Sequence, residues 1–517
     1  MSSALPSDPV VVAPQAPSSW LVPREFPAAT IRRGRIGLAL ALLAYGLATW
    51  LWLPHGIGYS WRECDTQAIA RNFLVDGFDP LHPRVDWRGT TPGYVECEFP
   101  LYQLMIATTL AAIGDVDAEW PGRLISMLSV MLGALALHRL LERRAGPAGA
   151  LAGGIAFLCT GSAMLMGTRV MPDALSLGLG VASLLPFVRY LATGSGVALA
   201  LSSAALALAA LQKPLALQLG LLLFAWTALL APRRLREPRL WIAFAAVLGV
   251  VGAWLVHGKN LHAETGLTFG VVSGGDTKFP ALEHFTKPEI YVQLGKTTAQ
   301  YGFSMLAGLA LLALLAKRQF DRSDLAWLGA VAVGLLVSLR YSYSSSMGPH
   351  YHAFAALAGA WCIARAWPAH AAGWQWAALV LLASAHAGWR LEVEQRVRHS
   401  VVATPVIQVA AEVRGVPSPK PLAVVRAEKP RFDPLWRRTN NYEDPRFLYQ
   451  SRLRGWVVPV DGFDEGTLTE LHGRGARLVY DPLPEQNSPE VTRWLDEHGE
   501  VWIDRFGVRV HRLHERL

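Results

Sequence analysis

The segment "LYQLMIATTLAAIG", Leu101–Gly114, decides how the chain is folded, because it is apolar but only 14 residues long. As an α-helix it would reach about 21 Å, whereas the hydrocarbon core of a bilayer is about 30 Å thick. Counting it as a span would also move every later basic loop to the opposite side of the membrane. We therefore predict that 101–114 is a helix that lies on, or dips into, the outer membrane interface.

The composition favours a polytopic membrane protein. Of the 517 residues, 52% are hydrophobic and 17% are charged, whereas an ordinary soluble domain carries about 25% charged residues. The net charge of +8 could suggest nucleic-acid binding, but Arg and Lys gather in short runs between apolar segments, as the positive-inside rule predicts for cytoplasmic loops. These runs are "IRRGR" (31–35), "ERR" (142–144), "PRRLREPR" (232–239) and "AKRQFDR" (316–322). We therefore exclude nucleic acid as a partner.

Apolar runs predict about eleven membrane spans within a transmembrane domain over 36–390. The predicted spans are 36–53, 121–141, 147–168, 174–191, 197–212, 215–231, 240–257, 302–316, 325–340, 352–367 and 374–390. Residues 1–35 lack the pattern of a secretory signal and are expected to form a disordered cytoplasmic tail. The basic loops then place the N-terminus inside and the C-terminus outside, with long external loops at 54–120 and 258–301. The second loop is expected to be mobile.

The composition changes at about residue 391. The stretches "PLAVVRAEKPRF", "GWVVPVDGF", "ARLVYDPL" and "VWIDRFGVRVHRL" are typical of strands, whereas "EGTLTELHGRG" and "SPEVTRWLDEHG" are typical of helices that end at Gly. This alternation predicts a small α/β domain over 391–517 on the extracytoplasmic side.

Ionisable and aromatic polar side chains gather at the predicted outer membrane face. Ionisable groups at membrane depth are costly, so they usually pair with one another or serve a site. The candidates come from the first external loop, from outer helix ends and from the tight turn after 197–212. They are Arg62, Glu63, Asp65, Glu96, Glu98, Arg169, Asp173, Lys213, Arg340, Tyr341, His350, Tyr351 and His352.

Several candidates also have a purely structural explanation. Asp65 could be the N-cap of a short amphipathic helix. Asp173 could stabilise a helix N-terminus, where an acid is favourable, or pair with Arg169. Lys213 could extend its ammonium group to the membrane interface.

Metal binding has weak support. Glu63 and Asp65 have an acid-x-acid spacing that could hold a divalent cation together with a phosphate. His350 and His352 lie two residues apart at a helix start, with too few companions for a zinc site. They could instead cap the helix or contact a substrate. We expect no cofactor and assign no metal ligands.

Two of the four cysteines fall in the first external loop. Cys64 precedes Asp65, and Cys97 lies between Glu96 and Glu98, which could be solvated loop acids or substrate contacts. In an oxidising compartment, Cys64 and Cys97 could form a disulfide that ties the two acidic segments together.

The order of several motifs resembles a known family. An external-loop acid precedes an "ARNF" helix, and "GYVECEFPLYQ", "GRLISMLSVMLGALALHRLLERR", "RVMPDALSL", "LQKPL" and "HYH" follow in turn. With this topology, the chain resembles the GT-C fold glycosyltransferases. It is most similar to the bacterial branch related to the lipid A aminoarabinose transferase and the protein O-mannosyltransferases. The resemblance covers roughly residues 36–390, and the soluble domain also fits the pattern.

The resemblance implies an inverting transferase in the bacterial plasma membrane. Such enzymes move a sugar from a polyprenyl phosphate carrier to a lipid, glycan or protein acceptor at the extracytoplasmic face. Asp65 matches the loop acid and would be the general base, and Lys213 matches the lysine that binds the lipid phosphate. Arg62, Arg169 and Arg340 would also stabilise the departing phosphate. The remaining candidates would contact substrate.

Two other functions compete with glycosyl transfer. A transporter or flippase for lipid-linked sugars is expected to show repeated halves with broken helices at the membrane midplane, and the sequence contains none. A non-catalytic glycan-assembly protein would not need Asp65, Lys213 and the Tyr/His cluster together. The sequence therefore favours an enzyme, although it names neither the sugar nor the acceptor.

Overall fold

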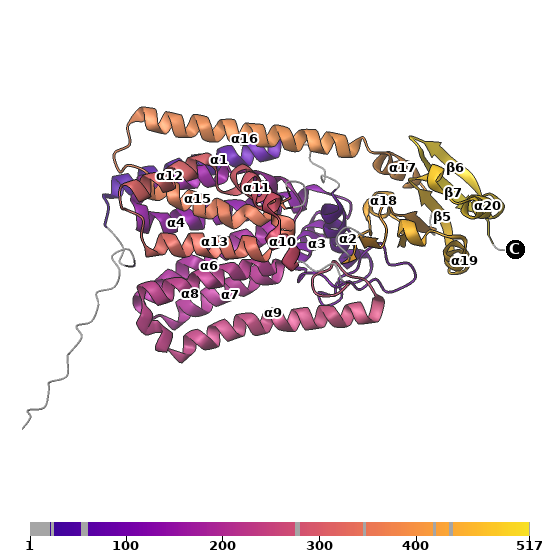
Figure 1. Ribbon diagram of the computed structural model, residues 1–517, viewed down its shortest axis with the longest axis horizontal. Helices are drawn as coiled ribbons and strands as arrows, with labels where there is room; N and C mark the ends of the chain where they lie inside the picture. Colours follow the sequence, from indigo (N-terminus) through magenta and orange to yellow (C-terminus); the bar gives the residue numbers. More distant parts are fainter. Residues whose placement is uncertain are drawn as a thin grey trace, which may run out of the picture.

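The computed structural model describes residues 21, 25–52, 60–274, 280–344, 348–416, 420–433 and 438–515. Figure 1 shows a helical bundle on one side and a small sheet on the other, along the longest axis of the molecule. Most of the predicted tail 1–35 lies outside the described residues. Its last part differs from the prediction, because helix α1 begins at Ala28 and includes the basic run 31–35.

The bundle consists of helices that largely coincide with the predicted spans. They are α1 (Ala28–Leu51), α4 (Trp120–Leu158), α5 (Gly161–Thr168), α6 (Pro172–Thr193), α7 (Gly196–Gln212), α8 (Leu217–Leu230), α9 (Pro238–Thr265), α12 (Met305–Ala316), α13 (Arg322–Val337), α15 (Ala353–Ala366) and α16 (Gly373–Val402). Helix α4 is broken at Gly146, whose φ is 80°, and at Pro147. The two predicted spans 121–141 and 147–168 therefore correspond to the two halves of α4, the second continued by α5.

Short segments join these helices. They are η1 (Pro214–Ala216), η2 (Pro232–Arg236), the π-helix η3 (Thr298–Gly302), α14 (Leu339–Ser342) and η4 (Pro349–His352).

The count of about eleven spans is not confirmed. Among the described residues, α1, α4, α6 and α9 are long and apolar enough to cross a membrane. A fifth span is added if 288–302 and 305–316, which are bent by 97° relative to one another, are counted as one. The number stays lower than predicted because α7, α8, α12, α13 and α15 contain only 12 to 17 residues each.

Four further helices lie at the end of the bundle that faces the sheet (Figure 1). They are α2 (Trp61–Val75), α3 (Leu101–Ile113), α10 (Leu282–Thr286) and α11 (Pro288–Thr297). Helix α3 is the short helix expected for 101–114, and it ends at Gly114 in the left-handed conformation that favours glycine. The predicted loop 258–301 is largely helical, because α9 continues to Thr265 and α10 and α11 follow.

The C-terminal region forms the predicted α/β fold. Its sheet has the strand order β4–β1–β5–β7–β6, in which β1 is parallel to β4 and β5, and β7 is antiparallel to β5 and β6. The strands are β1 (Leu422–Arg426), β4 (Arg454–Val458), β5 (Ala476–Asp481), β6 (Gly499–Arg505) and β7 (Val508–Leu513). The stretch 501–513 is a hairpin rather than one strand, because Phe506 and Gly507 turn the chain with φ of 57° and 76°.

The remaining elements of this region are small. They are α17 (Pro405–Val413), α18 (Arg446–Ser451), α19 (Glu465–Gly473), α20 (Pro489–His498), the ribbon of β2 (Phe432–Asp433) with β3 (Arg438–Thr439), η5 (Val460–Gly462) and η6 (Pro484–Gln486).

Strand β4 fixes the α/β domain to the first external loop. The backbone of Gly455 accepts from Gly89 N at 2.6 Å and donates to Asp86 O at 3.2 Å. Arg452 pairs with Asp117 at 2.7 Å, and Arg454 pairs with Asp76. The domain therefore lies directly beside the loop that carries α2.

Candidate active site

A capping box fixes the start of α2. Ser60 is the N-cap: its hydroxyl accepts from the Glu63 backbone at 3.3 Å, and the Glu63 carboxylate accepts from the Ser60 backbone at 3.4 Å. Asp65 follows in the second turn, so it is not the N-cap that the sequence allowed. The Asp65 carboxylate is thus not used to start the helix.

The Asp65 carboxylate lies in a buried setting with few partners. Its side chain is 7% exposed, and Oδ1 accepts a hydrogen bond of 2.9 Å from the indole of Trp87. Burial raises the pKa of Asp65 to about 8, although the Trp87 hydrogen bond and the charge of Arg62 act in the opposite direction. A carboxylate with a pKa near the working pH is suited to accept a proton in a general-base step.

Two cations meet one carboxylate within a turn of Asp65. Arg62 precedes Asp65 by three residues on α2, and its Nη2 lies 2.5 Å from Glu98 Oε2. Lys213, directly after α7, places Nζ 3.3 Å from the other oxygen of Glu98. Burial alone would raise the pKa of Glu98, but the charges of Arg62 and Lys213 hold that pKa well below its usual range. Glu98 is therefore an ionised bridge between the two cations.

Asp173 extends this cluster on the other side of Lys213. Its Oδ1 lies 3.4 Å from Lys213 Nζ and 4.0 Å from His350 Nε2. The second oxygen, Oδ2, is buried and accepts no hydrogen bond from any described residue. The ring of Tyr351 has its centre 5.9 Å from Lys213 Nζ. The cluster thus contains an open acceptor beside a paired ammonium group.

The predicted aromatic and basic residues of the late outer helix end continue from Tyr351. Tyr341 stacks on Tyr351 with ring centres 6.1 Å apart, and the Arg340 guanidinium lies 4.9 Å from the Tyr341 ring centre. His352 has a different environment, because its Nε2 lies 2.7 Å from the Ser342 carbonyl oxygen. Tyr341, His350 and Tyr351 therefore lie around the cluster, whereas His352 ties η4 to α14.

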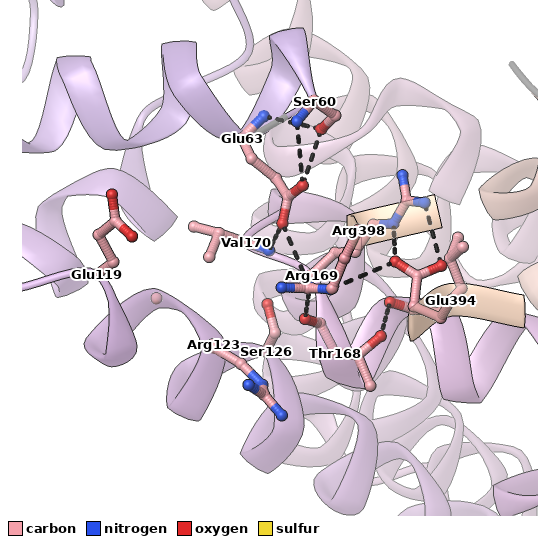
Figure 2. A network of polar contacts seen from close by, with 12 residues as sticks. Ser60, Glu63, Glu119, Arg123, Ser126, Thr168, Arg169, Val170, Glu394 and Arg398 are labelled. Atoms are coloured by element: carbon pink, nitrogen blue, oxygen red, sulfur yellow. Dashed lines mark hydrogen bonds and ion pairs between the residues drawn. The ribbon is translucent and has the colours of Figure 1, made fainter. Parts of the chain in front are cut away.

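A second network holds α2 from the opposite direction. Figure 2 shows Glu63 and Arg169 among residues of α16 and of the linker between α5 and α6. Arg169 binds Glu394 through two hydrogen bonds of 2.7 and 3.1 Å, and Arg398 lies 3.7 Å from the same carboxylate. Glu63 accepts from Val170 N at 3.1 Å and lies 3.8 Å from Arg398. Arg169 thus pairs with Glu394 rather than with Asp173.

Glu96 anchors the second external loop. Its carboxylate accepts from the Thr268 hydroxyl at 2.7 Å, from Val272 N at 2.6 Å and from Ser273 N at 3.1 Å. Glu96 is 1% exposed and Glu98 is 8% exposed, so neither is a solvated loop acid. Glu96 brings the segment after α9 next to the strand-like residues that precede Glu98.

The disulfide suggested by the sequence is not formed. Cys64 and Cys97 are free thiols, each buried in a different apolar cluster. Burial raises the pKa of both thiols. Hydrogen bonds and packing, rather than a covalent bridge, hold the two acidic segments.

Sequence reasoning missed three residues of this region. Trp87 donates to Asp65, and Glu394 and Arg398 form the centre of the second network. The i, i+4 pair at 394 and 398, directly after the last predicted span, is a signal that could have marked the network. Across the described ranges, no group of three or more His, Cys, Asp or Glu side chains could hold a metal ion.

The fold and the buried cluster define the class of protein as a helical membrane protein with the GT-C glycosyltransferase fold, as the sequence resemblance predicted. Residues 98–257 match the family model described as dolichyl-phosphate-mannose-protein mannosyltransferase. No curated protein matches the chain. The matched family and the similar solved structures are all glycosyltransferases.

Three solved structures illustrate the likeness. ArnT from Cupriavidus metallidurans in the apo state is 16% identical, with a TM-score of 0.64 over 92% of this chain and 98% of that chain. The same protein bound to undecaprenyl phosphate is 15% identical, with a TM-score of 0.60 over 92% and 97%. The oligosaccharyltransferase from Archaeoglobus fulgidus, with a tethered acceptor peptide, is 11% identical, with a TM-score of 0.52 over 93% and 74%. At these identities the likeness establishes the fold.

Proposed function

We propose that the protein is an inverting glycosyltransferase that moves a sugar from a polyprenyl phosphate carrier to a hydroxyl of a lipid, glycan or protein acceptor. The observation that carries this proposal is the bridge of Glu98 between Arg62 and Lys213, one helical turn from Asp65. A proton acceptor and two cations for a phosphate thus belong to one buried cluster. The solved ArnT complex with undecaprenyl phosphate supports a carrier of this chemical class.

The bond changes assign a role to each group. The acceptor oxygen attacks the anomeric carbon and its proton passes to Asp65, while the bond from that carbon to the phosphate oxygen breaks. The electron pair leaves with the polyprenyl phosphate. Arg62 and Lys213 stabilise the negative charge that develops there, sharing their donors between the phosphate and Glu98. No protein acid is required, because phosphate is a good leaving group.

Asp173 is suited to orient the sugar. Its Oδ1 is paired with Lys213, whereas Oδ2 is a buried acceptor with no hydrogen bond from the described residues. A sugar hydroxyl would satisfy that oxygen. Tyr351 and His350 would border the same space, because both lie against the Lys213–Asp173 pair.

The proposed site faces the extracytoplasmic side of the bacterial plasma membrane, with the N-terminus of the chain inside and the α/β domain outside. Helix α2 lies at the end of the bundle next to the sheet (Figure 1), whereas Arg35 and Arg239 stand near the starts of α1 and α9. The length of these helices separates the basic runs from Asp65, which supports this orientation under the positive-inside rule. We assign no metal to the reaction.

An assay with purified protein and a short-chain polyprenyl phosphate sugar tests the proposal. Transfer to an acceptor extract should release polyprenyl phosphate in proportion to the glycosylated product. Donor that remains chemically intact but crosses the membrane of a sealed vesicle would instead support a flippase. Donor that is neither cleaved nor moved, across donors of several sugars, would support the non-catalytic role.

A further inference from the structure

A cavity of about 790 Å³ opens at the end of the bundle remote from Asp65. It is lined by α1, by α4 around its break, by the last turns of α6 and by the start of α7. Helix α6 shows the separation, since it begins at Pro172, beside the partner of Lys213, and reaches the cavity with Leu185 and Arg189. The cavity therefore belongs to a different membrane face from the proposed active site.

The charges that line this cavity are not balanced. Arg35, Arg139, Arg143 and Arg189 line it together with a single acid, Glu142, so the formal charge is 4 − 1 = +3. Glu142 is already shared, because it lies 3.3 Å from Arg35 and 3.4 Å from Arg139. His138 lies 3.4 Å from it as well. The acid leaves nothing for the other two arginines.

Arg143 and Arg189 are the unpaired cations of the cavity. Within the described part of the chain, neither has an acidic partner within 4.0 Å. In contrast, Arg62, Lys213, Arg169 and Arg398 at the other end of the bundle each have a carboxylate partner. Two unpaired guanidinium groups at a cavity wall form a binding site for an anion, since guanidinium binds phosphate oxygens in a forked geometry.

The rest of the wall is apolar and open to the bilayer. Leu185, Pro186, Val197 and Leu201 line the cavity, and the side chains of Val197 and Leu201 are 72% and 60% exposed. Exposed aliphatic side chains on a membrane helix contact acyl chains. A free inorganic anion would have no use for this apolar half, whereas a lipid would occupy both halves.

We propose that this cavity binds the head group of an anionic glycerophospholipid, with its phosphate between Arg143 and Arg189 and an acyl chain along Val197 and Leu201. Basic pockets between membrane helices are known to hold such head groups. Binding here would fasten the break of α4 at Gly146 and Pro147 to the ends of α6 and α7. The inference goes beyond the proposed function and does not depend on it.

Retention of defined lipids by the full chain tests the proposal. The protein is exchanged into detergent with equal amounts of phosphatidylglycerol and phosphatidylcholine, and bound lipid is counted by native mass spectrometry. The wild type should retain phosphatidylglycerol in preference. The double variant R143Q/R189Q should lose that preference at least tenfold.

A matched control changes the same charge outside the cavity. Arg233 and Arg236 are exposed in η2 and do not line the cavity, so R233Q/R236Q should keep the wild-type preference. Equal losses in both double variants would show diffuse surface attraction and overturn the proposal. Equal retention of both lipids by the wild type would also overturn it, whether or not the variants fold. Displacement of phosphatidylglycerol by millimolar inorganic phosphate would identify a free-anion site instead.

Discussion

Two buried charge networks meet on α2, and they differ in how completely their acids are satisfied. Glu63 accepts from Ser60 and Val170 and lies near Arg398. Asp65, two residues later, accepts one hydrogen bond, from Trp87, and its pKa is raised to about 8. An acid whose acceptors are filled by the protein holds structure in place, whereas an under-satisfied buried acid is held ready for a ligand. The Glu63 network therefore positions α2, and the Asp65 cluster is the candidate for chemistry.

The sharpest way to break this comparison is to neutralise Asp65. Asp65→Asn should lower turnover by a factor of 100 or more, because the proton acceptor is lost. The thermal transition should stay close to that of the wild type, since the Asn carbonyl oxygen can still accept from Trp87. Release of polyprenyl phosphate under steady-state conditions provides the measurement. Undiminished transfer would reject the base assignment, though not the class of enzyme.

The pH dependence of activity sharpens the same assignment. Asp65 must be deprotonated to act as a base, so kcat/KM should rise about tenfold per pH unit towards pH 8 and level off above it. Because the folded-state pKa is above the usual value near 4, ionisation of Asp65 costs stability as pH rises from about 4 to 8. Both effects should be absent from Asp65→Asn. A flat kcat/KM profile between pH 6 and 9 in the wild type would contradict the account.

Removal of Lys213 tests the phosphate side of the cluster. Lys213→Ala should reduce kcat/KM for the donor by about tenfold, mainly through weaker use of the phosphate-bearing substrate, since one charge-assisted contact is lost. Lys213→Arg should restore part of this loss, because it keeps the cation beside Glu98 and Asp173. Donor kinetics of Lys213→Ala equal to those of the wild type would remove the phosphate role from Lys213.

Glu394 tests the other half of the comparison. Glu394→Gln leaves Arg169 and Arg398 without their shared buried carboxylate, which should lower the free energy of unfolding by about 3 kcal/mol. Turnover per folded molecule should fall by less than tenfold, and the midpoint of the pH profile should not move. Thermal unfolding and the pH–rate profile are measured on the same preparation. A catalytic loss without a stability loss would place Glu394 among the reacting groups.

The smallest effect is expected for the cysteines of the two acidic segments. A thiol count on denatured, unreduced protein should give four free thiols, because Cys64 and Cys97 are separate in the structure. Cys97→Ser should leave turnover near the wild-type value. A count of two would restore the disulfide between the segments.

The sequence predicted the parts of the fold and the site that depend on local pattern. Helix α3 ends where its apolar run meets Gly114, and the alternation after residue 391 predicted the strands and helices of the α/β domain. Lys213 and Asp173 could be placed at one membrane face because both stand at helix ends. The positions of these side chains relative to one another depended on packing that no local pattern contains.

Pairings between distant segments were beyond the sequence. Glu63 and Asp65 have the same charge and nearly the same surroundings in the chain, yet Val170 and Arg398 fill one and Trp87 alone contacts the other. Arg169 was expected to serve the phosphate or Asp173, but α16 supplies Glu394 from 225 residues away. The count of spans also failed, because helices of 12 to 17 residues have apolar runs like those of longer ones.

A density map of the protein with a bound polyprenyl phosphate sugar, or an uncleavable analogue, tests the central claim most directly. The account predicts phosphate oxygens within about 3 Å of Lys213 Nζ and the Arg62 guanidinium. The anomeric carbon should face the Asp65 carboxylate with room for one acceptor oxygen between them. A phosphate bound away from Lys213, or a sugar that Asp65 cannot reach, would contradict it.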